Sequence, residues 1–369
     1  MDETTYLLDI DKLKLGDIIL SSTKSFSSYG IRFMTLGKYS HAAIYVGGTT
    51  IEATLEGVFS KNPQRLPFEK ESQVAIFRHK SQLSEQQIQK LCIFARSKCG
   101  SLYALPEAIT IRARSLLKIE ETRKQFCSRL VAKAYEYAGV DLGNLRNPAY
   151  CTPKQLGLCN AFHQVTDVIK VASPEEAEFA NTIDPNIQHQ MQTFQWLGQV
   201  RDLVKTNKNI KDIEIDTLND VNEFLLKYPE FDEQVSEYVK SSGYLEYYKY
   251  DSKVNPYRYN YILFDSVMKE QSDPHAFIIS QYEKEPEMLR RFSQCLDGFI
   301  AYASQRRLKF YNLHIELYIN LLNDIARRIF VISHGLECLG ELKTADHLRK
   351  TNFFCQRIIE LGRKELEDS

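Results

Sequence analysis

Long apolar segments and an excess of either charge are both missing from this chain of 369 residues. Charged side chains interrupt even the most hydrophobic windows, and none approaches the roughly 20 continuous apolar residues that span a bilayer. The 47 basic and 48 acidic residues leave a formal net charge of -1, so no global field draws the molecule onto nucleic acid or an anionic membrane. We therefore expect no transmembrane segment and no nucleic-acid partner, while peripheral contact with lipid stays open.

The chain also lacks a recognisable export signal and paired cysteines. Its start, MDETTYLLDIDKLKLGD, carries acidic residues where a secretory signal has a basic region, and no adequate apolar stretch follows. The eight cysteines form no CxxC pair, which argues against a zinc ribbon and a secreted disulfide framework. We expect a cytoplasmic protein with reduced thiols and without a metal or an organic cofactor, although delivery by a specialised secretion route also fits these residues.

What the sequence does contain is enough apolar material for more than one core, since 43% of the residues are hydrophobic and 11% aromatic. The first half mixes short strand-like runs with helices, whereas the second half is helical almost throughout. Between them, residues 173–190 are polar, contain two prolines and show no sustained periodicity. We predict a domain over residues 1–172, a linker over 173–190 and a helical domain of unknown role over 191–369.

Short apolar runs bounded by turn signals predict four strands in the first half, at 17–20, 41–46, 50–54 and 74–78. A helix is expected over 84–98, with Ser84 as its N-cap. The clearest helix is expected over 127–138, because its apolar residues recur every three to four positions and Gly139 stands where a helix commonly closes. The first half therefore combines a small sheet with at least two helices.

The periodicity of the second half predicts helices at 191–206, 216–227, 231–241, 259–270, 285–304, 308–332 and 342–366. A tyrosine-rich passage over 244–264 suggests either a stacking surface or a source of core side chains, and we favour the core. The arginine pairs at 306–307 and 327–328 are interpreted as solvated faces and not as phosphate clamps. No partner of the helical half can be named from these patterns.

Cys127 is the candidate for a reactive group, because it opens the clearest helix. The N–H groups and the positive end of the dipole at a helix N-terminus stabilise a thiolate. Apolar residues three, four and seven positions further along put the sulfur on the helix face that packs inward. The alternative is a small buried residue that merely starts a core helix, so a partner is needed to decide.

His41 is that partner, because it begins the expected strand 41–46 and could act as a general base toward the thiol. Side chains alternate along a strand, so an even-numbered hairpin loop puts Glu52 and Glu56 on the histidine face, and an odd loop turns both away. A two-residue loop places Glu52 opposite Ala43, diagonal to the histidine. A four-residue loop instead aligns Glu56 with it, and either carboxylate could orient the imidazole.

Five segments also carry a family resemblance when taken in order: LGDIILSS, GKYSHAAIYVGG, IEATLEGV, QFCSRLVAKAYEYAGV and CTPKQL. Together they resemble a circularly permuted papain-like domain of the NlpC type, in its YiiX-like branch of amidohydrolases. The likeness covers about residues 1–165. It implies an α+β fold with a small antiparallel sheet and a nucleophile helix, followed here by an all-α domain that it does not explain.

The same resemblance assigns roles to three residues. In that family the histidine of the S-H-x-x-I-Y segment is the base, the acid of the following I-E-A strand orients it, and the cysteine at the helix start attacks a carbonyl. These roles fall on His41, Glu52 and Cys127, with Glu56 as the alternative acid. A Cys-His-Glu catalytic triad is the interpretation that follows.

Other residues are weaker candidates for the site. Tyr45 shares the strand face of His41, and Tyr103 follows a glycine before the cysteine helix, as a tyrosine does in related domains. Both could line the site or simply pack. Residues 28–38 could likewise form one wall of an acyl-binding groove or belong to the core.

The resemblance implies a thiol hydrolase that cleaves an amide, ester or thioester bond in a peptide or other acyl-containing substrate through an acyl-enzyme. The alternative within the same resemblance is an acyltransferase that passes the acyl group to a lipid or an amine. An interpretation from another class is an inactive papain-like scaffold that presents the helical domain to a protein partner.

Overall fold

The computed structural model describes residues 4–22, 38–54, 56–101 and 125–367, and the chain forms two compact units, residues 1–194 and 195–369. The range 173–190, expected as a linker, contains helix α6 (Pro174–Ala180) and the first turns of helix α7 (Pro185–Thr206). The two units are described separately below.

A six-stranded antiparallel sheet forms the centre of the first unit, in the order β5-β4-β3-β2-β6-β7, and β1 pairs separately with β8. The four predicted strands are confirmed as β2, β3, β4 and β6. The other four, β1, β5, β7 and β8, were missed. The strands are β1 (Tyr6–Leu8), β2 (Ile18–Ser21), β3 (His41–Tyr45), β4 (Thr50–Thr54), β5 (Gly57–Lys61), β6 (Val74–His79), β7 (Phe162–Val165) and β8 (Ile169–Val171).

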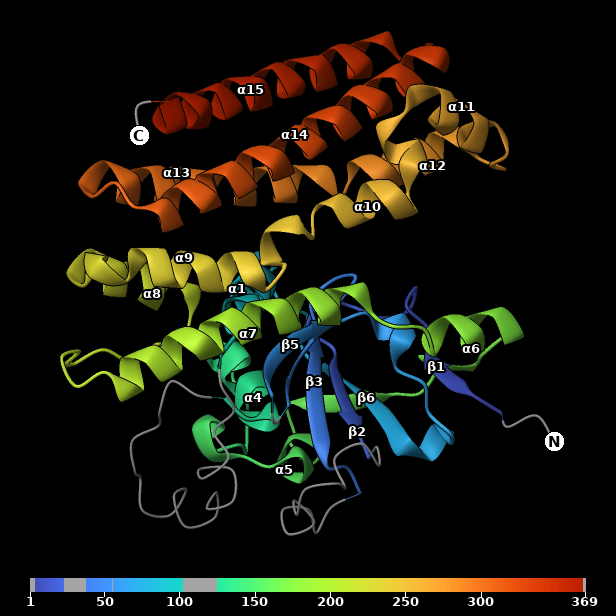
Figure 1. Cartoon of the computed structure of the whole chain (residues 1–369). Coiled ribbons are helices and arrows are strands. Elements are labelled where there is room, and N and C mark those ends of the chain that lie inside the picture. The colour runs from blue at the N-terminus through green and yellow to red at the C-terminus, as the bar shows by residue number, and fades with distance from the viewer. Residues whose placement is uncertain (1–3, 23–37, 55, 102–124, 368–369) are drawn as a thin grey trace. The chain divides into compact units, whose positions relative to one another are not determined.

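Helices α1 (Glu85–Ser97) and α4 (Cys127–Tyr137) pack in one core with the sheet, and α5 (Pro153–Gly157) follows them. The predicted N-cap is confirmed, since the Ser84 side chain accepts a hydrogen bond from the Gln87 N–H. Leu130 and Val131 of α4 are fully buried in the core that also contains Ile44 of β3. Helix α4 packs against β3 of the sheet (Figure 1). It thereby positions the residue at its start, Cys127.

The edge strand β5 is covered by the first turns of α7. The Ser60 N–H donates to Gln190 Oε1 at 2.6 Å, and Gln190 Nε2 donates back to the Ser60 carbonyl at 2.6 Å. Phe194 stacks on Phe59 with 4.7 Å between ring centroids. The Gln190 side chain thus forms hydrogen bonds with backbone groups that an exposed edge strand would offer to another chain.

The second unit is a layered helical assembly in which α14 packs against both α13 and α15 (Figure 1). The predicted helices are confirmed, but α10 and α12 were missed, and α14 continues six residues beyond its predicted end at 332. No helix in the described ranges combines the length and the apolar character needed to cross a membrane. The helices after α7 are α8 (Leu218–Lys227), α9 (Asp232–Ser241), α10 (Lys249–Val254), α11 (Tyr261–Lys269), α12 (Pro274–Tyr282), α13 (Glu285–Gln305), α14 (Lys309–Cys338) and α15 (Leu342–Glu367).

Arg328 corrects the interpretation of the arginine pair at 327–328 as a solvated face. Its guanidinium is buried and binds Glu285 through two hydrogen bonds of 2.8 Å, while Nη1 donates to the Tyr259 hydroxyl. Burial lowers the pKa of Arg328, but the hydrogen bonds to Glu285 and the charge of that carboxylate outweigh burial and raise the pKa overall. The side chain is therefore a charged cross-link within the helical core.

Candidate active site

Cys127 is the first residue of α4, directly after the extended N-cap residue Phe126. The first turn contains no acidic side chain that would oppose the positive end of the helix dipole. The side chain is 7% exposed, which leaves the sulfur almost enclosed at the edge of the core. The position combines partial access with unsatisfied helix N–H groups, as a nucleophilic cysteine requires.

His41 and Glu52 form a buried pair on adjacent strands. His41 Nε2 lies 2.8 Å from Glu52 Oε2, and the two residues are 4% and 5% exposed. Burial lowers the pKa of His41, but the charge of Glu52 and hydrogen bonds to Cys127 and Glu52 raise it to about 9. Burial raises the pKa of Glu52, but the charge and hydrogen bond of His41, with a contribution from Lys61, lower it to about 2. The pair is thus ionised at neutral pH.

The Cys127 side chain completes the group through its hydrogen bond with His41, which is one of the causes that raise the histidine pKa. His41 Nε2 is the ring nitrogen that contacts Glu52. His41 is the first residue of β3 and Cys127 the first of α4, so the two side chains meet where both elements begin. The structure therefore brings together the three residues to which the sequence assigned a triad.

The hairpin between β3 and β4 determines which acid meets His41. Glu52 pairs with Ala43, the register that a two-residue loop predicts. Gly47 and Gly48 have φ values of +89° and +63°, the left-handed conformations that a tight hairpin turn needs at both positions. The alternative acid, Glu56, is exposed and accepts a hydrogen bond of 2.7 Å from the Thr54 hydroxyl. The histidine contact thus involves Glu52.

The other sequence candidates lie apart or are not described. The Tyr45 ring packs in a core cluster with Ala43 and Ile76, and its hydroxyl accepts a hydrogen bond of 3.0 Å from the Gly48 N–H at the other end of the strand. This contact fastens the hairpin turn. Tyr103 and most of the proposed groove wall, residues 28–38, lie outside the described residues.

Lys61 is a member of this cluster that the sequence analysis missed. Its ammonium group forms an ion pair with Glu52 Oε1, so the carboxylate is held from both sides, by His41 through one oxygen and by Lys61 through the other. Lys61 ends β5, a strand that the sequence did not predict. The sheet order, with β5 beside β4, is the only signal for this contact, and no sequence spacing reveals it.

A second missed feature fixes the first turn of α4. The Ser128 hydroxyl donates to the Cys151 carbonyl at 2.7 Å, and Cys151 Sγ donates to the Ser128 carbonyl at 3.3 Å. Arg129 is fully buried between the rings of Phe126 and Tyr150. These contacts tie the residues on both sides of Cys127 to the loop before α5, so the thiol is held in place by its neighbours.

The first unit combines an antiparallel sheet with a helix that begins at a cysteine, the arrangement that the resemblance to papain-like enzymes implies. Residues 12–149 match the family model of permuted papain-like amidase enzymes of the YaeF/YiiX type, peptidase family C92. The match confirms the predicted resemblance and fold class of the N-terminal half, and it supports an enzyme of the thiol hydrolase kind. No curated protein and no solved structure matches the chain. The second unit lies outside the matched range.

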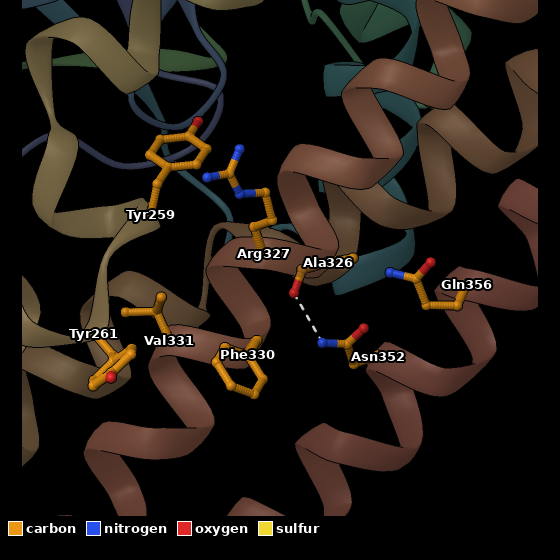
Figure 2. A pocket seen from close by; sticks show the side chains of 8 residues that line it. All are labelled: Tyr259, Tyr261, Ala326, Arg327, Phe330, Val331, Asn352 and Gln356. Carbon is orange, nitrogen blue, oxygen red and sulfur yellow. Dashed lines mark hydrogen bonds between the residues drawn. The ribbon is translucent and has the colours of Figure 1, made fainter.

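A separate pocket of about 390 Å³ lies in the second unit, between α14, α15 and the start of α11 (Figure 2). Figure 2 shows Asn352 directed at α14, where its amide donates to the Ala326 carbonyl at 2.9 Å. Tyr261 and Phe330 give the pocket an aromatic wall, and Arg327 gives it a cation. It shares no lining residue with the cluster around Cys127.

Proposed function

We propose that the first unit is a cysteine-dependent hydrolase that cleaves an amide, ester or thioester bond through an acyl-enzyme on Cys127. The observation that carries the proposal is the contact of one thiol, one imidazole and one carboxylate in a nearly enclosed site at a helix N-terminus. The family match to amidases supports the same chemistry. The finer assignment of three catalytic residues is our own.

In the acylation step, His41 holds the proton that leaves the Cys127 thiol, and the sulfur attacks the carbonyl carbon. A carbon–sulfur bond forms, the carbonyl oxygen becomes an oxyanion, and N–H groups at the start of α4 donate to it. The bond to the leaving group then breaks, and His41 passes its proton to the departing amine, alcohol or thiol. Glu52 stabilises the imidazolium throughout by its charge and its 2.8 Å hydrogen bond.

In the second step water attacks the thioester, with His41 as the base that removes its proton. The carbon–sulfur bond breaks, the acid is released and the thiol regains a proton. An acyltransferase would follow the same path with an amine or hydroxyl in place of water. A competition between water and an added amine therefore separates the two activities, because a transferase forms the amide faster than the acid.

A thiol-directed acyl probe tests the proposal on the full chain. We expect one labelled cysteine per chain, no labelling in Cys127→Ala and strongly reduced labelling in His41→Ala. Cys295→Ala is the matched control, since Cys295 is partly exposed and belongs to the second unit, and its labelling should equal that of wild type. Labelling spread over several cysteines without dependence on His41 would favour the inactive scaffold.

A further inference from the structure

A cluster of mixed ligand types lies in the second unit, away from the residues that the proposed hydrolase uses. Asp265 belongs to α11, and His334 and Cys338 are one helical turn apart on α14. One ligand atom from each residue lies within 4.8 Å of the other two. Within the described ranges this is the one group of three such side chains at that spacing. The residues thus form a defined constellation and not a general acidic surface.

The distances within the cluster fit the ligands of a shared metal ion better than they fit direct hydrogen bonds. His334 Nε2 lies 3.4 Å from Asp265 Oδ2 and 3.7 Å from Cys338 Sγ, both long for hydrogen bonds. Around a tetrahedral zinc ion, the usual bond lengths separate a nitrogen from an oxygen ligand by about 3.3 Å and from a sulfur ligand by about 3.6 Å. His334 Nε2 is therefore spaced from the other two ligand atoms as in such a site, and all three atoms lie within 4.8 Å of one another.

Asp265 supplies an independent observation. Its second carboxylate oxygen, Oδ1, is buried and has no hydrogen-bond partner among the described residues. A buried carboxylate oxygen without a partner is unfavourable, because it has lost its water. A cation bound between the carboxylate and His334 would offset that cost.

The packing of α11 on α14 explains how the ligands come together. A Cβ atom on Gly335 would lie 2.7 Å from the Phe264 ring, a contact that only glycine avoids. The close approach of the helices sets Asp265, next to Phe264, beside His334, next to Gly335. Tyr261 packs edge-on against the His334 ring at 4.9 Å between centroids and so limits its orientation. Cys338 ends α14, where the negative end of the helix dipole favours a cation.

We propose that Asp265, His334 and Cys338 bind one divalent transition-metal ion of the zinc class. Thiolate and imidazole ligands select zinc and its neighbours over magnesium and calcium, which prefer oxygen. Binding replaces the thiol proton of Cys338, which is released to solvent, and the histidine binds as neutral imidazole. The three protein ligands leave a fourth position for water or another donor. The ion clamps α11 to α14 and thereby stabilises the helical unit.

The test is a zinc titration of the full chain in the Cys127→Ala background, which removes a competing thiol of the candidate active site. After chelator treatment under reducing conditions, calorimetry should show one zinc ion per chain. Cobalt should give the absorption of a tetrahedral site, with a sulfur-to-metal charge-transfer band. His334→Ala and Cys338→Ser should each weaken zinc binding by more than about 100-fold, because loss of a residue that only supports a ligand already costs up to that factor. Cys338→Ser should also remove the charge-transfer band.

His275→Ala is the matched control, because His275 is an exposed histidine of the same unit, 2.8 Å from the carboxylate of Glu341. It should leave the zinc affinity unchanged. Asp265→Asn keeps the shape of the side chain and gives a second test if the His334 variant fails to fold. A wild-type site that binds no zinc, or binding that survives in His334→Ala and Cys338→Ser, overturns the proposal.

Discussion

His41 in the first unit and His314 in the second are both buried side chains, with exposed fractions of 4% and 0%. Their surroundings differ. His41 faces the Glu52 carboxylate and the Cys127 side chain, and its pKa rises to about 9. His314 donates from Nδ1 to the Phe310 carbonyl at 2.8 Å and stacks on Phe299, and burial lowers its pKa to about 4.

The comparison separates burial from electrostatics. Burial favours the neutral imidazole in both units, and only His41 has a buried carboxylate close enough to reverse that effect. His314, enclosed by aromatic rings on α14 and its neighbours, is a packed core residue. His41 is charged, next to the Cys127 sulfur and bonded to an acid, so the imidazolium can stabilise a thiolate and then give its proton to a leaving group. Four predictions test whether this difference holds.

The largest expected effect distinguishes the two histidines by activity. His41→Ala should lower the second-order rate of Cys127 acylation by roughly 10²–10⁴-fold, the usual contribution of a general base. His314→Leu should leave that rate within a factor of two, because His314 lies in the other unit and has no acid or nucleophile beside it. Stopped-flow labelling with the acyl probe measures both. Equal losses in the two variants would mean that the rates report folding and not proton transfer.

The second prediction removes the carboxylate charge that distinguishes the surroundings of His41 from those of His314. Glu52→Gln removes the charge that raises the histidine pKa, so that pKa should fall below its ordinary value of 6.5. Acylation should slow by about 10–100-fold, since a hydrogen bond to a charged group contributes about 1.5–3 kcal/mol. Glu56→Gln is the control and should change neither quantity, because Glu56 bonds Thr54. The imidazole titration is followed by NMR, and the reverse order of the two variants would reject the assigned acid.

The sequence predicts much of the first site because the signals are local. Cys127 and His41 each begin a recognisable element, and the choice between Glu52 and Glu56 depends only on the length of one hairpin loop. The two-glycine turn sets that length. Hairpin register is thus accessible to reasoning from neighbouring residues.

What the sequence does not predict depends on contacts between distant segments. Lys61 meets Glu52 only because β5 adds to the sheet beside β4. The burial of Arg328 depends on Glu285, 43 positions earlier, which accepts two of its hydrogen bonds. His334 lies beyond the predicted end of its helix. In the sequence Gly335 resembles a stop signal, and only the structure shows that Phe264 packs against this glycine within the helix.

The third prediction uses pH and the opposite shifts of the two histidines. The folded pKa of His314, about 4, is below the ordinary 6.5, so the unfolded state binds more protons between these values. The stability of the second unit should be complete above pH 6.5 and decrease as the pH falls toward 4, by up to about 1.4 kcal/mol per pH unit. Denaturant unfolding followed by Trp196 fluorescence measures it, because Trp196 is the single tryptophan and lies beside His314.

His41 should behave in the opposite way. Its folded pKa, about 9, exceeds 6.5, so its contribution is complete below pH 6.5 and is lost as the pH rises through 9. Hydrogen exchange of the β3 amides should therefore accelerate above pH 6.5 beyond the intrinsic pH effect, and this excess should vanish in His41→Ala. His314→Leu should flatten the fluorescence-detected slope between pH 4 and 6.5. Slopes of the same sign in both units would contradict the comparison.

The smallest effect concerns Lys61, which has no counterpart beside His314. Its side chain is 31% exposed, and partly solvated ion pairs contribute about 0.2–1 kcal/mol, so Lys61→Met should slow acylation by no more than about fivefold. Lys61→Arg keeps the charge and should restore most of the rate. In the Glu52→Gln background the Lys61→Met effect should disappear, because the lysine acts through that carboxylate. An undiminished effect in the double variant would show that Lys61 acts on the substrate directly and not by holding Glu52.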